Sequence, residues 1–265
     1  MNDKGSYEDL EKYLIQDAVS SEGTFEMIGG CVYERDGDQV LLNKVTLDEV
    51  TGVEEDILAG RGSDFSSKFH RVLVSCTKAL SNEDGSVVVD SKGELRKIYK
   101  DLAVSDQVYL LFLLRIISVE DGNIFRFKVA CPFCKPTRFL MRSVNLNELE
   151  IKRMKEPEKR IYDYTTKSGS TFRCSVMTAA SEAKAGTKKN DIATRVISSR
   201  ILEMNGNPVK FSDLKKLKLR ERNELRRAFE EKEGGVDTKV TIECEECGAE
   251  FDTQIDITQG NFFSR

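Results

Sequence analysis

Two Cys-x-x-Cys pairs, more than a hundred residues apart, constrain the fold of this chain more than any other feature. Each pair lies between two strand-like runs, which is the pattern of a zinc knuckle on a β-hairpin. Two knuckles together supply the four thiolates that a tetrahedral structural Zn²⁺ requires. The pattern therefore predicts that one Zn²⁺ is shared by Cys131, Cys134, Cys244 and Cys247, so that the chain between the pairs leaves and returns at one point.

Other chemistries of the two pairs fit the sequence less well. The beginning of the chain shows no apolar signal-peptide core, so we expect reduced thiols rather than disulfides. A redox motif at Cys131 and Cys134 remains an alternative. That chemistry favours a second cysteine at a helix N-terminus, whereas a β-like run follows Cys134. A zinc deaminase requires a His-x-Glu motif, and the only histidine, His70, precedes Arg71 and Val72.

Length and composition indicate a protein with a polar surface and no strong charge bias. The chain has 265 residues, with 41 Lys and Arg against 45 Asp and Glu, so no general attraction to nucleic acid or to a membrane surface is expected. No apolar run reaches the roughly 20 residues that span a bilayer. The other cysteines lie in apolar settings and are expected to be small core residues in a cytosolic protein: Cys31, Cys76 and Cys174.

Helical and strand-like patterns both occur in the first half of the chain. Residues 6–18 predict an amphipathic helix, and residues 23–42 predict β-structure with a turn at Asp36-Gly37. Thr46 and Glu49 have capping-box spacing, which predicts a helix ending near Gly60. Further helices are predicted over residues 64–80 and 108–119, the second capped near Ser105 and apolar nearly all round. Arg115 interrupts that apolar helix, and we expect it to pair with a carboxylate of residues 54–56 or to cap backbone carbonyls.

Residues 145–235 are predicted to form an insertion between the two knuckles. Their sequence predicts a brief helix over residues 145–155, a hairpin around Lys167–Ser170, and helices over residues 191–204 and 212–232 that end at Gly234-Gly235. The fold class expected is α+β: a helical core, a zinc-ribbon-like pair of Cys-x-x-Cys β-knuckles and an inserted α/β subdomain. The expected parts are a helical arm (1–22), a core with the first knuckle (23–144), the insert (145–235), and the second knuckle with an aromatic tail (236–265).

Residues that could carry catalysis do not form a convincing set. Glu54, Glu55 and Asp56 occupy successive helical positions and would point in different directions. Phosphate-binding and nucleophile-elbow motifs are absent from the sequence. Residues 215–222 are basic, but acidic residues share their helix in register, so a solvated face is favoured. We therefore expect no enzymatic activity. Phe262 and Phe263 are expected to fold back onto the domain or to dock on a partner.

Many residues, spread over nearly the whole chain, match one known family. They are Val45-Thr46, the run from Thr51 to Leu58, Arg61, Leu102 to Asp106, Leu114-Arg115, both Cys-x-x-Cys pairs, Lys167 to Gly169, Met177-Thr178, Gly235 to Asp237, and Phe262-Phe263. In their order and spacing the chain resembles the T-even-like bacteriophage baseplate hub assembly proteins of contractile-tailed phages, also called tail assembly chaperones.

The resemblance implies a non-enzymatic role in assembling the central hub of the baseplate. The protein would act as an assembly factor, and it could also remain in the virion as a minor structural component. Its partners would be other phage tail and baseplate hub proteins, met in the host cytoplasm and in the viral tail; no membrane, nucleic acid or small-molecule substrate is expected. A structural Zn²⁺ would lock the ends of the insert. The alternative function is a zinc-ribbon module that binds nucleic acid.

Overall fold

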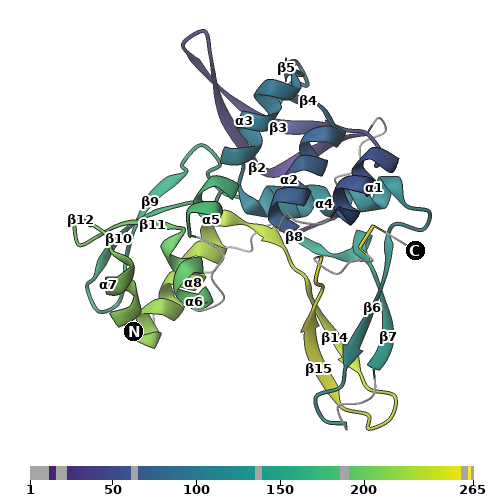
Figure 1. Ribbon diagram of the computed structural model, residues 1–265. Helices are drawn as coiled ribbons and strands as arrows, with labels where there is room; N and C mark the ends of the chain where they lie inside the picture. The colour runs from purple at the N-terminus through teal and green to yellow at the C-terminus, as the bar shows by residue number, and fades with distance from the viewer. Residues whose placement is uncertain are drawn as a thin grey trace, which may run out of the picture.

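The computed structural model describes residues 12–15, 23–60, 65–134, 139–185, 191–257 and 262–263. In Figure 1 a core of sheet and helices lies at the top, the insert lies to the left, and two hairpins project downward. The α+β class expected from the sequence is confirmed. The core, however, is not purely helical, because a four-stranded antiparallel sheet forms one layer of it.

The core sheet has the strand order β2-β3-β4-β5, with long strands first and short ones last. The predicted turn joins β2 to β3, where Asp36 and Gly37 have φ angles of 55° and 90°. Four helices pack beside the sheet. The bounds are β2 Thr24–Arg35, β3 Asp38–Leu47, α1 Gly52–Ala59, α2 Phe65–Cys76, β4 Thr77–Ser81, β5 Val87–Val89, α3 Lys92–Asp101 and α4 Val104–Ser118.

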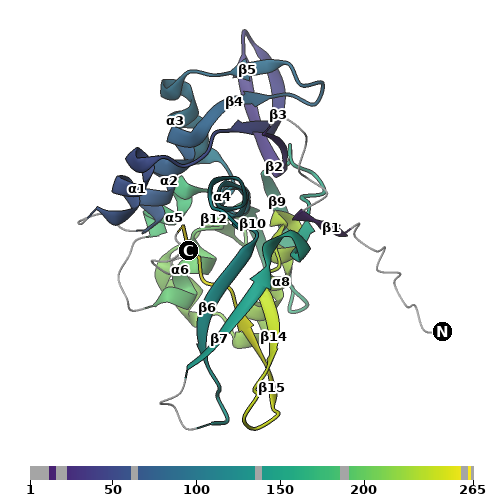
Figure 2. The same ribbon diagram turned by 90° about the vertical axis from the view of Figure 1, so that its right-hand side faces the viewer.

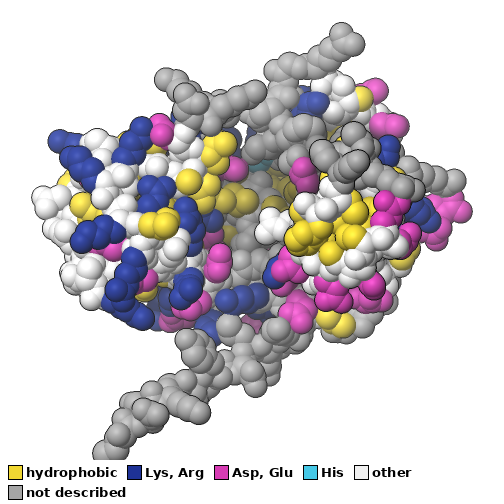
Figure 3. Space-filling view, turned by 90° about the horizontal axis from the view of Figure 1, so that it is seen from below, with side chains coloured by type: hydrophobic (Ala, Val, Ile, Leu, Met, Phe, Trp, Pro, Cys, Tyr) yellow, Lys and Arg dark blue, Asp and Glu magenta, His cyan; other side chains and the backbone are white. Residues whose placement is uncertain are grey.

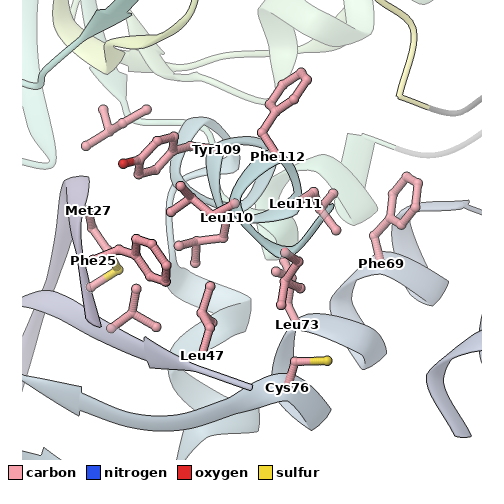
Figure 4. Packing of buried hydrophobic residues seen from close by; sticks show 14 of the residues in the cluster. Phe25, Met27, Leu47, Phe69, Leu73, Cys76, Tyr109, Leu110, Leu111 and Phe112 are labelled. Atoms are coloured by element: carbon pink, nitrogen blue, oxygen red, sulfur yellow. The ribbon is translucent and has the colours of Figure 1, made fainter. Parts of the chain in front are cut away.

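Helix α4 runs through the centre of the core, as its apolar sequence predicts. Figure 2 views it nearly end on, with chain on all sides. Every side chain from Leu110 to Leu114 is at most 2% exposed. Figure 4 shows Tyr109, Leu110 and Leu111 pointing toward side chains from β2, β3 and α2, among them Phe25 and Leu73. A helix without a polar face is stable only when it is surrounded in this way.

The insert forms a second, smaller packing unit. Its sheet has the order β12-β11-β10-β9, and a separate cluster of buried side chains that includes Phe172, Cys174 and Phe229 packs under it. The bounds are β9 Ile161–Thr165, β10 Thr171–Ser175, α5 Ala179–Ala185, α6 Ile192–Ser198, β11 Ile201–Met204, β12 Asn207–Pro208, α7 Phe211–Lys216 and α8 Leu219–Glu233.

A three-stranded sheet joins the two ends of the insert. Its order is β1-β8-β13, formed by Lys12–Leu14, Glu150–Lys152 and Gly235–Val236. β8 opens the insert and β13 follows its last helix, and the two strands pair directly through Val236 and Ile151. The amide of Asp237 extends this pairing by donating to the carbonyl of Glu150 at 2.8 Å. The ends of the insert are therefore held by backbone pairing within a β-sheet.

Two antiparallel hairpins leave the core side by side (Figure 1). The first consists of β6 (Ile124–Ala130) and β7 (Phe139–Asn145), and the second of β14 (Lys239–Glu243) and β15 (Glu250–Gln254). They are separate two-stranded sheets in the described chain. Each Cys-x-x-Cys pair follows the first strand of its hairpin and so lies at the end remote from the core, while the insert begins and ends near the hairpin bases. The prediction that a metal locks the ends of the insert is wrong for this reason.

Several predicted helices are shorter than expected because part of each segment forms a strand. Residues 77–80 belong to β4, which pairs with β3. Residues 201–204 form β11, which pairs with β10. Within residues 145–155 only Leu146–Glu148 is helical, as one 3₁₀ turn, and β8 follows. In each case the neighbouring strand supplies backbone partners that a local sequence pattern does not reveal. The helix predicted over residues 212–232 is interrupted between α7 and α8.

Two predicted helix starts are also wrong. Thr46 lies in β3, and the capping box that opens α1 is formed by Thr51 and Glu54. Helix α4 begins after Ala103, and the Ser105 hydroxyl donates instead to the carbonyl of Glu233 at 3.0 Å. The helix predicted over residues 6–18 is contradicted at Lys12–Leu14, which forms β1. The rest of that prediction lies outside the described residues, apart from Ile15.

Candidate metal centre

The two hairpins bring the four predicted cysteines together at their far ends. The sulfur atoms of Cys131, Cys134, Cys244 and Cys247 all lie within 4.8 Å of one another. Each β-ladder fixes where its cysteines lie, because the first strand of the hairpin ends immediately before the pair. Residues 110 or more positions apart in the sequence thus converge on a single point that could hold a metal ion.

The separations between sulfur atoms fit metal ligands and exclude disulfides. Cys131 Sγ lies 3.8 Å from Cys247 Sγ, and Cys134 Sγ lies 3.7 Å from Cys244 Sγ. A tetrahedral ion with metal–sulfur distances of about 2.3 Å has sulfur–sulfur edges of about 3.8 Å. A disulfide would need about 2.05 Å. The described cysteines are all free thiols, so the geometry is that of four ligands around one position.

Backbone hydrogen bonds shape the second knuckle around its first cysteine. The amide of Cys244 donates to the carbonyl of Ala249 at 2.9 Å, and the amide of Gly248 donates to the carbonyl of Cys244 at 2.8 Å. Gly248 adopts φ +67°, which glycine reaches without steric cost. Amides of Cys247 and Glu246 donate to the Cys244 sulfur and lower the pKa of Cys244 to about 7. The knuckle therefore makes the Cys244 thiol easier to ionise than a free cysteine near neutral pH.

The four thiols cannot all ionise without a cation. Hydrogen bonding to the sulfurs of Cys247 and Cys244 raises the pKa of Cys134 to about 12. One thiolate in the cluster therefore discourages the next, because like charges at this distance repel. A bound divalent cation reverses this effect, and its binding would release the remaining protons. The donor set thus suits a metal that prefers sulfur.

A basic side chain that sequence reasoning missed connects the two hairpins beside the cysteines. Arg142 on β7 forms an ion pair with Glu245 at 3.0 Å and donates to the carbonyl of Glu243 at 3.1 Å. Leu140 packs against Cys131 and Cys244, which are 4% and 1% exposed. A sequence signal for Arg142 was present, since the first hairpin carries basic residues and the second is rich in acidic ones.

Other residues singled out from the sequence lie away from the cysteines. Arg115 donates to the carbonyls of Phe262 and Ile124, which confirms the predicted capping of backbone carbonyls. Phe262 is 1% exposed and packs edge-on against Phe112, so it folds back onto the core. Of the carboxylates at 54–56, only Glu54 is buried, and it serves the capping box.

The cysteines outside the two pairs are core residues, as predicted. Cys31, Cys76 and Cys174 are at most 5% exposed. Burial raises the pKa of each thiol to about 12, so they stay protonated near neutral pH. Arg61, one of the residues that carry the family resemblance, lies outside the described residues. Within the described residues, none of the helices combines the length and apolar character that crossing a lipid bilayer requires.

A family comparison connects this architecture to a known group of proteins. The model of the family described as "T4 bacteriophage base plate protein" matches residues 43–259. The match covers most of the core, the whole insert and all four cysteines. Searches of curated proteins and of solved structures gave no match. The chain therefore belongs to the T4 bacteriophage base plate protein family.

Proposed function

We propose that this protein is a non-enzymatic component of the phage tail that acts in assembling the central hub of the base plate. The observation that carries the proposal is the family match over residues 43–259. Its partners would be other tail and base plate hub proteins. It would meet them in the host cytoplasm and act there as an assembly factor. The role has two forms: the protein either leaves after assembly or also stays in the finished virion as a minor component.

A further part of the proposal is that the four cysteines hold one structural Zn²⁺. Four thiolates without any carboxylate or water position are the donor set of structural zinc sites. The sulfur separations of 3.7 and 3.8 Å support this assignment. The ion would clamp the far ends of the two hairpins, and the chemistry it supplies is structural. The chain's own contribution is Arg142, which holds the second hairpin through Glu245.

A phage that lacks this gene tests the role in assembly. We expect infected cells to accumulate incomplete base plates, visible by electron microscopy, and a plasmid copy of the gene to restore complete tails. Complete tails without the protein would overturn the proposal.

Mass spectrometry of purified mature particles then separates the two forms of the role. A few copies per particle would identify a retained component, whereas absence would identify a factor that leaves after assembly.

A further inference from the structure

A groove of about 730 Å³ separates the two hairpins along one side. Residues 141–144 of β7 form one wall and residues 240–243 of β14 form the other, with Phe127 and Glu245 completing the lining. Consecutive residues line each wall. This is the arrangement expected where the edge of a strand, and not only one of its faces, borders the space.

The hydrogen-bond pattern shows which backbone groups point out of each hairpin. The amide of Leu146 donates to the carbonyl of Asn123, one register step beyond the β6–β7 ladder. In an antiparallel ladder, hydrogen-bonded pairs alternate with non-bonded pairs. The backbone groups of Met141 and Ser143 therefore turn away from β6, toward the open edge.

The open edge of β14 follows in the same way from the hydrogen bonds of its own hairpin. Cys244 donates to the carbonyl of Ala249, and Ile255 donates to the carbonyl of Thr238. The backbone groups of Thr241 and Glu243 must then turn away from β15. The bond from Arg142 of β7 to the carbonyl of Glu243 shows directly that this edge faces the first hairpin.

The carbonyls of Met141 and Glu243 on the two facing edges already accept hydrogen bonds from Arg142, whereas amides on these edges have unused hydrogen-bonding capacity. In the described part of the chain no ladder pairs β7 with β14, and the amides of Ser143 and Thr241 have no protein acceptor. An open strand edge is a template for another extended segment. At about 3.4 Å per residue, walls of four residues accommodate an added strand of roughly four or five residues.

Side chains in and around the groove indicate which segment fits. Its inner lining includes apolar residues from both hairpins: Phe127, Val144, Val240 and Ile242. The second hairpin is rich in acidic residues, and exposed Glu243 lies at the rim. Arg142 is already paired with Glu245, so its charge is balanced. Figure 3 shows acidic side chains gathered on the hairpin lobe, at the right, and basic ones on the insert at the left.

We propose that the groove binds an extended segment of another base plate protein, which adds a strand between β7 and β14. This rests on the proposed function and names the chemistry of the partner. Apolar residues of the segment enter the groove, and alternate Lys or Arg residues face outward toward the acidic rim. Backbone hydrogen bonds supply affinity, and the pockets for alternate side chains supply specificity. A metal ion bound by the four cysteines would hold both edges in place before binding, which lowers the entropic cost of association.

A designed peptide tests the groove on the full chain loaded with Zn²⁺. The probe is the acetylated, amidated peptide Val-Lys-Val-Lys-Val, titrated while backbone amide resonances are followed by NMR. We expect the largest shifts at Met141, Ser143 and Thr241. A peptide with N-methyl groups on the valines cannot donate at those positions, and we expect it to bind at least about tenfold more weakly. Replacing both lysines by glutamate should also weaken binding.

Matched protein variants locate the site on the intended edge. Ser143→Pro removes an amide that points into the groove and leaves the β6–β7 ladder intact, so binding should fall at least about tenfold. Lys128→Pro removes an amide on the opposite edge of the same hairpin and should leave binding unchanged. Shifts confined to other surfaces, or equal binding of the N-methylated peptide, would overturn the proposal. The peptide control needs no altered protein, so a misfolded variant does not decide the test.

Complementation of the gene-deleted phage separates this inference from the proposed function. If Ser143→Pro fails to restore complete tails and Lys128→Pro restores them, the groove is required for assembly. If both restore tails and the valine-lysine peptide does not bind, the groove proposal fails while the hub role stands. If the deleted phage assembles normally, the hub role fails whatever the peptide result.

Discussion

The central core and the paired hairpins use different means to reach a fixed structure. Around α4, side chains from two layers bury one another, and Phe112 and Leu113 have no exposed surface. The hairpins are only two thin ribbons, with Leu140 and Ile242 among their few buried side chains and Phe139 and Met141 more than half exposed. A pair of two-stranded ribbons cannot bury enough apolar surface to be stable alone. The cysteines therefore lie in the part of the molecule where little apolar surface is buried.

The strongest test of this difference removes one metal ligand. Cys244→Ser should abolish stoichiometric Zn²⁺ binding, because a structural site needs all four donors. In small zinc domains the metal contributes on the order of 10 kcal/mol. Here we expect that loss to appear locally. Hydrogen exchange should accelerate at residues 240–251 and at β6–β7, while amides of α4 stay protected.

Cys174→Ala provides the matched control for that experiment. It also removes a buried thiol, but one that lies in the core of the insert, so metal content measured by mass spectrometry should stay at one ion per chain. Equal exchange rates in the hairpins of Cys244→Ser and of the unchanged protein would show that the ribbons hold themselves together without the ion.

The next largest effect belongs to the core. Phe112→Ala removes a fully buried ring that contacts Phe262, and such truncations cost about 3–5 kcal/mol through lost burial and the cavity left behind. Chemical denaturation should show this loss in the global transition. Phe133→Ala, at an exposed ring on the first knuckle, should change stability by less than about 0.5 kcal/mol. Similar losses in both variants would contradict the proposed contrast.

The same contrast explains what could be predicted from sequence. The cysteine spacing predicted which four residues converge, because a Cys-x-x-Cys turn between two strands has few geometries. The apolar run of α4 predicted its central position. Both signals are local in the sequence or depend on residue type alone.

Pairing between distant segments could not be predicted. Lys12–Leu14 and Ile201–Met204 are strands because β8 and β10 supply partners for them, and isolated they fit a helical period as well. The predicted position of the cysteines at the ends of the insert was wrong for a similar reason. The sequence shows that residues 145–235 lie between the pairs, but not that β8 and β13 close the insert at the other end of the hairpins.

A smaller effect on stability is expected from a buried carboxyl group of the core. Asp106 is fully buried on α4 and accepts a hydrogen bond from the amide of Gly29 at 3.0 Å. Burial raises the pKa of Asp106 to about 6 from an ordinary value of 3.8, although backbone amides and Arg160 counteract this. A raised carboxyl pKa contributes stability that is complete below about pH 3.8 and lost as pH rises through 6.

Asp106→Asn should therefore gain stability relative to the unchanged protein as pH rises. Between pH 4 and pH 7 the difference in unfolding free energy should shift in favour of the variant by on the order of 2 kcal/mol. Urea denaturation at both pH values measures it. Asp36→Asn, at the exposed turn of the core sheet, removes a carboxylate without burial and should show no such shift. A shift in the opposite direction would mean that Arg160 stabilises the ionised form.

The smallest expected effect lies at the margin of the core, where a cap and not packing fixes a helix. The Thr51 hydroxyl donates to Glu54 at 2.6 Å, and the Ser75 hydroxyl donates to the other carboxylate oxygen. Burial alone would raise the pKa of Glu54, but these hydrogen bonds prevail and lower it to about 2. The stability from this lowered pKa is present above about pH 4.5 and is lost as pH falls through 2.

Thr51→Ala should cost about 1 kcal/mol at pH 7 and raise the pKa of Glu54 measured by NMR. Thr46→Ala, at the position the sequence pattern favoured, should leave the pKa of Glu54 unchanged, because that hydroxyl contacts Thr24 within the sheet. If Thr46→Ala moved it instead, the helix would begin where the spacing first predicted.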